Sequence, residues 1–303
     1  MKWVAKKRLQ SVIAISVVHG QLRVAHAARA KNAVAVLHAA GATLTLDLQH
    51  PEPELVGQEI KNHLDTCGIR ERHCVVALPA DWVMTQHTRV PELSPEDTAS
   101  LLLIEAEKGF PSNPDELQIA RSAHRSGEAP YVTQLAVRHE QLNRLGEVLK
   151  AAGLKAVSYT IGITALPGAL PTTGAGRMTL LLEPKGATLL VAAGGGIVTL
   201  RTLEATIDSE VGENVINGPA LARELRISFE QLPADLRAEV RELALRGEPS
   251  MVAQLAGILG AWTRDAGLSL DHGAAAPRPA AEEIVEQLAQ RHLLEAKRDL
   301  EFL

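Results

Sequence analysis

The chain of 303 residues has little cysteine, few aromatic residues and no long hydrophobic run. Its two cysteines, Cys67 and Cys74, form no CxxC pair and have no zinc-type histidine spacing, which excludes a disulfide-stapled miniprotein and predicts no metal site. We interpret them as reduced core thiols. Three Phe, three Trp and two Tyr are too few for the stacking platforms of proteins that bind single-stranded nucleic acids.

Neither sign of charge dominates the composition. The chain has 31 Lys plus Arg against 36 Asp plus Glu, which gives a formal net charge of -5. Because no overall positive field draws the chain to nucleic acid or acidic lipid, we expect no nucleic-acid partner. No stretch of about 18 apolar residues occurs, so we expect no membrane span in this chain.

The two halves of the chain repeat one order of predicted elements. In the first half these are a hairpin at 12–18 and 21–28, one or two strands at 33–48 about a turn at Ala40-Gly41, a helix at 54–67, and an apolar strand at 74–78. In the second half they are strands at 178–182, 187–193 and 197–203, a helix at 219–231, a strand at 240–246 and a helix at 250–266. Such a repeat is typical of a two-lobed α/β fold of the ribonuclease-H-like or actin-like kind, which by itself gives no function.

A different unit separates the two halves. It has predicted strands at 82–90, 118–124 and 131–137 and predicted helices at 94–108 and 140–152, the first with Ser94 and Asp97 at the spacing of an N-terminal cap. We therefore expect a first lobe at 1–79, an inserted α+β module at 80–157, a second lobe at 158–270, and a linker with a C-terminal helix at 271–303.

The C-terminal helix keeps an apolar stripe that includes Ile284, Leu288 and Leu293. A helix outside the two-lobe core with such a stripe needs something to cover it. Packing against this chain's own lobe is one alternative. Docking on a neighbour, or leading toward a membrane, is the other.

The most specific motifs lie in and before the inserted module. They are VVALP at 75–79, RVPELS at 89–94, IEAEKGFP at 104–111 and PDEL at 114–117. This run resembles the PilM family, cytoplasmic actin-like proteins of type IV pilus assembly that are related to FtsA and to the cytoplasmic part of GspL of type II secretion. Val137-Arg138 and Gly153-Leu154-Lys155 match the family's next strand and helix. Glu105 and Glu107 fit a solvated helix face, and nothing local marks them as catalytic.

The resemblance implies a cleft between the lobes that holds Mg-ATP on two phosphate loops of the Asp-small-Gly type and on a glycine-rich strand end. Such loops need glycine and free backbone N–H groups near phosphate, and a carboxylate near the metal. In the first loop, Ala14 stands where the acid should be. Gly20 alone remains of its glycines.

The second and third loops also depart from the family pattern. Glu183 or Pro184 takes the acid position of the second loop, and proline removes a backbone donor. The residues that persist as candidates for residual nucleotide binding are Glu183, Gly186, Thr188 and Gly247. We expect no catalytic and no metal-binding residues, and a cleft that does not hydrolyse ATP, although residual ATP binding stays open.

By resemblance, the chain is a cytoplasmic scaffold, peripheral to the inner membrane, whose partner is a PilN-like inner-membrane protein or another platform component. One alternative is a divergent actin-like ATPase or sugar-kinase-like phosphotransferase; another is a dimerising module without a pilus connection. Between Leu203 and Pro219 there is room for only a loop, where actin-like relatives insert a helical lid. The second-lobe lid is therefore expected to be reduced.

Overall fold

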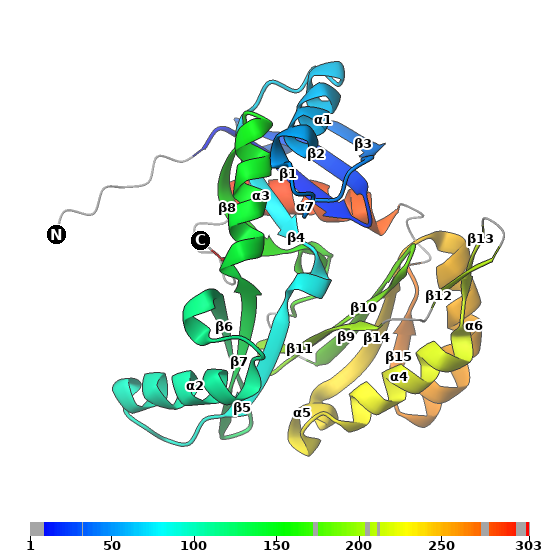
Figure 1. Cartoon of the computed structure of the whole chain (residues 1–303). Coiled ribbons are helices and arrows are strands. Elements are labelled where there is room, and N and C mark those ends of the chain that lie inside the picture. The colour runs from blue at the N-terminus through cyan, green and yellow to red at the C-terminus, as the bar shows by residue number, and fades with distance from the viewer. Residues whose placement is uncertain are drawn as a thin grey trace.

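The computed structural model describes residues 9–31, 33–171, 175–203, 207–210, 213–273, 279–294 and 301–302. Two five-stranded sheets form two lobes, and a smaller three-stranded sheet lies beside the second lobe and below the first in the view of Figure 1. This arrangement confirms the predicted two-lobed α/β architecture with an inserted module.

The first sheet contains β1 (Ser11–Val18), β2 (Gln21–Ala30), β3 (Ala33–Thr43), β4 (His73–Leu78) and β8 (Lys155–Ile161). Their spatial order is β3-β2-β1-β4-β8. The runs of valine, isoleucine and alanine in β1 and β4 are buried almost throughout, as expected for strands covered on both faces.

The predicted turn at Ala40-Gly41 is wrong, because β3 continues through it and pairs with β2 along its whole length. Gly41 serves a different purpose. A Cβ at this position would lie 2.7 Å from Nη1 of Arg23, so the glycine makes room for the guanidinium of the neighbouring strand.

Three longer helices cover the first sheet. Helices α1 (Pro53–Thr66) and α3 (His139–Ala151) pack against each other, and α7 (Ala280–Leu294) packs against β1 and β2. In Figure 1, α7 lies behind the sheet and α1 and α3 in front of it. The apolar stripe of α7 is therefore buried on this chain's own lobe, which confirms the first of the two alternatives for the C-terminal helix. The rest of the predicted helix, residues 295–300 and 303, lies outside the described residues.

The second sheet contains β9 (Gly176–Glu183), β10 (Gly186–Ala193), β11 (Gly196–Leu203), β14 (Val240–Arg246) and β15 (Ser269–Asp271). Its order, β11-β10-β9-β14-β15, is that of the first sheet: the third, second and first strands of the lobe in chain order, followed by two strands that run parallel to the first. The duplication predicted from the sequence is confirmed. Helices α4 (Gly218–Glu230), α5 (Ala234–Glu239) and α6 (Pro249–Asp265) bury their apolar residues in the core of this lobe.

Four short elements of the second lobe were not predicted. Strands β12 (Ile207–Glu210) and β13 (Glu213–Ile216) pair where only a loop was expected, so that expectation is wrong. Strand β15 takes the start of the predicted linker, and α5 precedes β14. Each element is six residues or shorter, too short for a clear apolar period.

The inserted module contains η1 (Ala80–Trp82), β5 (Met84–Arg89), α2 (Pro95–Gly109), η2 (Pro114–Glu116), β6 (Leu117–Ser126) and β7 (Ala129–Arg138). Its sheet has the order β5-β7-β6. Ser94 caps α2 by accepting a hydrogen bond from the Asp97 N–H, as predicted.

Side chains of this module bind the second lobe. The Tyr131 hydroxyl donates to Oδ2 of Asp235 at 2.8 Å, and the Thr133 hydroxyl donates to the Val198 carbonyl at 3.2 Å. On the other side, the pairing of β8 with β4 crosses the expected boundary between residues 157 and 158. The chain therefore returns to the first sheet before it enters the second lobe.

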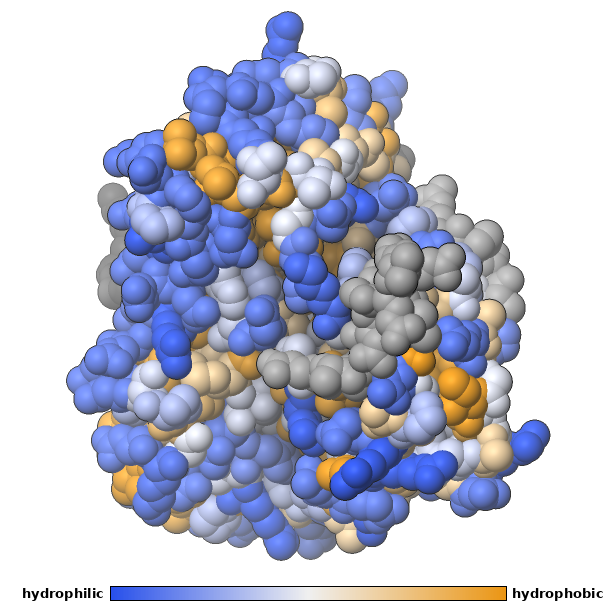
Figure 2. All heavy atoms as spheres, turned by 45° about the vertical axis from the view of Figure 1, so that its right-hand side comes forward, coloured by the Kyte–Doolittle hydropathy of each residue, from blue (hydrophilic) through white to orange (hydrophobic). Residues whose placement is uncertain are grey.

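Figure 2 shows a largely hydrophilic face over both lobes, on which hydrophobic residues form small separate groups. Such groups are ordinary for a protein surface in water. Among the described residues, no helix has the length and apolar character needed to cross a bilayer.

Candidate functional site

Three loops meet between the lobes, at the position where the resemblance places a nucleotide. They are the β1-β2 turn, the β9-β10 turn and the junction between β14 and α6. One hollow of about 100 Å³ lies against the first two loops, and a second of about 270 Å³ lies against all three elements together with the start of α7. The structure thus brings together segments that are more than 200 residues apart in the sequence.

The first loop is a two-residue turn at His19-Gly20, with φ of 50° and 75°. Ala14, at the expected position of the acid, is fully buried and paired between Ala25 and Val75 of the neighbouring strands. No side chain of this position can reach a metal. Burial lowers the pKa of His19, and the nearby Asp81 opposes that shift.

The second loop has a carboxyl group, but it is enclosed. Oε2 of Glu183 accepts a hydrogen bond of 3.0 Å from the Thr188 hydroxyl on the neighbouring strand β10. Burial, and to a smaller extent the charge of Asp81, raise the Glu183 pKa to about 7, although the Thr188 hydrogen bond opposes the shift. A carboxyl that resists ionisation is a poor metal ligand, and once ionised it would repel a phosphate.

The third loop keeps its glycine for a reason of packing. Gly247 has φ of 149°, and a Cβ there would lie 2.7 Å from the Cβ of Leu182 and 2.9 Å from its carbonyl oxygen. Only glycine fits this approach to the end of β9. The residue is therefore required by the strand junction itself.

The four sequence-predicted residues are only partly brought together. Glu183 and Thr188 line the smaller hollow, and Glu183 and Gly247 line the larger one. Gly186 lines neither, because it begins β10, where a Cβ would lie 3.3 Å from the Leu203 carbonyl oxygen.

Sequence reasoning missed two carboxylates, Asp47 and Asp81, that line the smaller hollow. Asp81 follows the buried parallel strand β4 by three residues. The carboxyl ends of parallel strands are where binding residues gather in α/β sheets, so this signal was present in the sequence. No group of three His, Cys, Asp or Glu in the described part of the chain is placed to hold a metal ion.

The two hollows are small for a nucleotide. Sites for small molecules usually have volumes of about 300–1,000 Å³, against about 100 and about 270 Å³ here. Pro279, Ala280 and Ile284, from the start of α7, line the larger hollow. Part of the interlobe space is therefore taken by this chain's own C-terminal helix.

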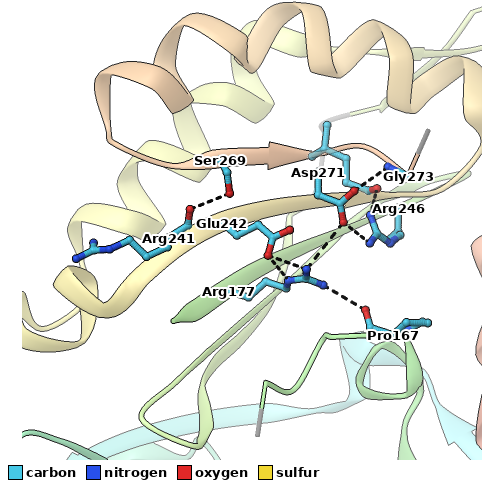
Figure 3. Close-up of polar contacts among 9 residues, drawn as sticks. Pro167, Arg177, Arg241, Glu242, Arg246, Ser269, Asp271 and Gly273 are labelled. Atoms are coloured by element: carbon cyan, nitrogen blue, oxygen red, sulfur yellow. Dashed lines mark hydrogen bonds and ion pairs between the residues drawn. The ribbon is translucent and has the colours of Figure 1, made fainter. Parts of the chain in front are cut away.

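Figure 3 shows an ionic network that fixes the crossing between the lobes. Nε and Nη2 of Arg177 donate to one oxygen of Glu242 at 2.9 and 2.7 Å, and Nη1 donates to the Pro167 carbonyl at 3.2 Å. Arg246 binds Asp271 at 2.6 Å, and Asp271 also accepts from the Gly273 N–H at 3.0 Å. Pro167, where the chain enters the second lobe, and Gly273, where it leaves that lobe, are therefore both hydrogen-bonded to residues of the second sheet.

A larger hollow lies elsewhere, between the inserted module and the first lobe. This groove of about 790 Å³ is lined by β6, by β8, by the β10-β11 turn and by α7. Strands β6 and β8 are end strands of their sheets, and residues of both strands line it. Arg291 of α7 lines it and donates to the Thr164 carbonyl at 2.8 Å, and the exposed Arg121 adds a second positive charge.

No protein-family model matches this chain, and no curated protein matches it by sequence. Solved structures match over almost its whole length. A chain of a PilM–PilN type IV pilus biogenesis complex aligns with a TM-score of 0.65 and 21% identity, covering 94% of this chain and 96% of that one.

Two further structures agree with this match. The cytoplasmic domain of EpsL, an inner-membrane component of the type II secretion system of Vibrio cholerae, aligns with a TM-score of 0.55 and 11% identity, covering 95% of this chain and 97% of that one. A Bacteroides thetaiotaomicron protein with an actin-like ATPase fold and unknown function has a TM-score of 0.51 and 13% identity, covering 91% and 96%. The predicted actin-like fold, and the PilM-like resemblance at the level of fold, are confirmed.

Proposed function

We propose that this protein is a cytoplasmic assembly scaffold, peripheral to the inner membrane, of a type IV pilus or type II secretion-like platform, and that it hydrolyses no nucleotide. The observation that carries the proposal is the interlobe cleft, whose three loops enclose only small hollows around a half-buried Glu183 with a raised pKa. A protein of this fold that does not hydrolyse a nucleotide in its cleft acts by binding other proteins on its surface. The likeness in fold to a PilM–PilN chain and to the EpsL cytoplasmic domain supports assembly as their use.

The partner in this proposal is the cytoplasmic segment of a PilN-like inner-membrane protein. The groove of about 790 Å³ beside the inserted module has the size for several residues of an extended chain. Strands β6 and β8, each at the end of its sheet, lie along it, although the Arg125 N–H already donates to the Gly194 carbonyl and the Tyr159 carbonyl accepts from Phe302. Arg121 and Arg291 favour a segment that carries acidic residues.

The nucleotide half of the proposal is tested by calorimetry and thermal shift with Mg-ATP on the purified chain. We expect no heat of binding and no change in the melting temperature at millimolar Mg-ATP. A shift of several degrees with micromolar affinity would refute the scaffold proposal and favour a divergent ATPase or a sugar-kinase-like phosphotransferase. Release of inorganic phosphate without any acceptor would then indicate the ATPase, whereas ADP formation that depends on an added sugar would indicate the phosphotransferase.

The partner half is tested with the cytoplasmic segment of a PilN-like protein encoded next to this chain. We expect a labelled peptide of that segment to bind the full chain, and Arg121→Glu to weaken binding at least fivefold. Lys150→Glu is the matched control, since this exposed lysine lies on α3 and does not line the groove. Equal binding by wild type and both variants would contradict the groove as the site, and self-association without peptide binding would favour the dimerising module.

A further inference from the structure

The outer edge of β8 holds a short piece of this chain. Strand β8 ends the first sheet, and no strand of the described sheets pairs with its outer side. Instead, the Phe302 N–H donates a hydrogen bond of 3.1 Å to the Tyr159 carbonyl, and the Ser158 hydroxyl donates to Oε1 of Glu301 at 2.9 Å. We call Glu301 and Phe302 the tail.

The tail is anchored by its aromatic residue. Phe302 is 2% exposed and belongs to the hydrophobic core of the first lobe, although it lies far along the chain from Tyr159, with which it pairs. Tyr159, whose carbonyl receives the backbone hydrogen bond, is 7% exposed in the same core. A backbone bond to a sheet edge, together with one buried side chain, is the mode in which sheets bind extended peptides.

Glu301 also lines the groove between β6 and β8. The tail therefore lies at the border of this groove, next to Ser158 and Thr160 of β8. A segment that entered the groove and paired further along β8 would meet the tail at these positions.

We propose that the edge of β8 is a peptide-binding site for an extended segment in which a hydrogen-bond acceptor is followed by a large apolar residue. The tail of this chain occupies the site as a built-in ligand, and a partner segment of the same chemistry enters by displacing it. In naming the inner-membrane partner as the source of that segment, the proposal rests on the function proposed above.

Because the tail is covalently attached to the chain, it outcompetes weakly binding free peptides for the edge of β8. A tethered ligand acts at an effective concentration that can reach the millimolar range, so a free peptide must bind correspondingly more tightly to replace it. Removing the aromatic anchor should therefore raise the apparent affinity for a free peptide without any change in the site.

The test uses the full chain with Phe302→Ala and a fluorescent peptide with the sequence of residues 295–303. We expect the peptide to bind this variant at least tenfold more tightly than the wild-type chain, by fluorescence anisotropy. A peptide in which alanine replaces the phenylalanine should bind neither. Phe229→Ala is the matched control, because it removes a buried aromatic residue of the second lobe and leaves β8 unchanged.

Equal binding of the peptide to wild type and to a folded Phe302→Ala chain would overturn the proposal. If circular dichroism shows that Phe302→Ala is unfolded, Glu301→Gln replaces it, since this variant keeps the anchor and weakens the bond to Ser158. We then expect severalfold tighter binding of the peptide than by wild type, and unchanged binding overturns the proposal.

The experiments distinguish failure of the β8 peptide site from failure of the proposed scaffold function. The peptide of residues 295–303 reports on the β8 site whether or not a PilN-like partner exists. If that peptide binds Phe302→Ala and the PilN-like segment fails to compete with it, displacement by the inner-membrane partner is refuted. If the PilN-like segment binds the wild-type chain and the tail peptide binds no variant, the β8 proposal is refuted and the scaffold proposal stands.

Discussion

Replacing Glu183 by glutamine should make the protein more stable, and increasingly so at higher pH. The half-buried residue places its carboxyl group between the lobes, with the Thr188 hydroxyl as its hydrogen-bond donor and the charge of Asp81 nearby. Glutamine keeps the shape and can still accept that hydrogen bond, but it never ionises. The substitution therefore isolates the cost of placing a negative charge in the cleft.

The magnitude follows from the pKa of this group. Burial raises the Glu183 pKa from 4.5 to about 7, so between these values the folded state binds more protons than the unfolded state. Stability is then lost as the pH rises through this window, and the full cost is reached above pH 7. At 1.36 kcal/mol for each pKa unit, the cost is about 3 kcal/mol at pH 8 and about 1 kcal/mol at pH 5.

The assay is urea unfolding of wild type and Glu183→Gln at pH 5, 6, 7 and 8. We expect the variant to exceed wild type by about 3 kcal/mol at pH 8 and by about 1 kcal/mol at pH 5. Glu248→Gln is the control, because this carboxylate lines the larger hollow but is exposed to solvent. A gap between Glu183→Gln and wild type that stays constant from pH 5 to 8 would refute the reasoning.

Two further substitutions test the strand junction and the lobe crossing. Gly247→Ala should destabilise the protein by about 1–3 kcal/mol in urea unfolding, because the added Cβ would clash with Leu182 at a φ that alanine avoids. Gly257→Ala is the control and should be neutral or stabilising, because its Cβ meets nothing within 4 Å. Equal effects of the two substitutions would contradict this account. Arg177→Ala should lower the free energy of unfolding by about 1–3 kcal/mol, because it leaves the Pro167 carbonyl and the Glu242 carboxylate without their hydrogen-bond donor. It should also speed proteolysis between the lobes. Unchanged cleavage would show that the network does not hold the crossing.

The longer elements could be predicted because their local chemistry is unambiguous. The apolar run of β4 and the Ser94 cap of α2 are signals within a few residues, and they lie where predicted. Gly41 shows the limit of such signals. Its neighbourhood in sequence indicates a turn, but the arginine that it accommodates lies on another strand, 18 residues away.

The sequence indicates which residues of the expected nucleotide loops are missing better than it indicates what the remaining residues do. The absence of an acid at Ala14 and the presence of Pro184 can be read directly from the sequence. The roles of Thr188 and Gly247 cannot, because both are set by contacts across strands, one with Glu183 and the other with Leu182. Residues that looked like remnants of a nucleotide site are used by the fold.

The sequence by itself determined the repeated order of strands and helices and the inserted module, because both depend on residue types at short spacing. It also predicted loops that depart from the nucleotide-binding pattern of the family that the chain resembles. Only the tertiary structure decided how much space remains between the lobes, which lobe covers α7, and where Phe302 is buried. These depend on packing between segments far apart in the chain, and packing is fixed by the volume and direction of side chains that no local pattern records.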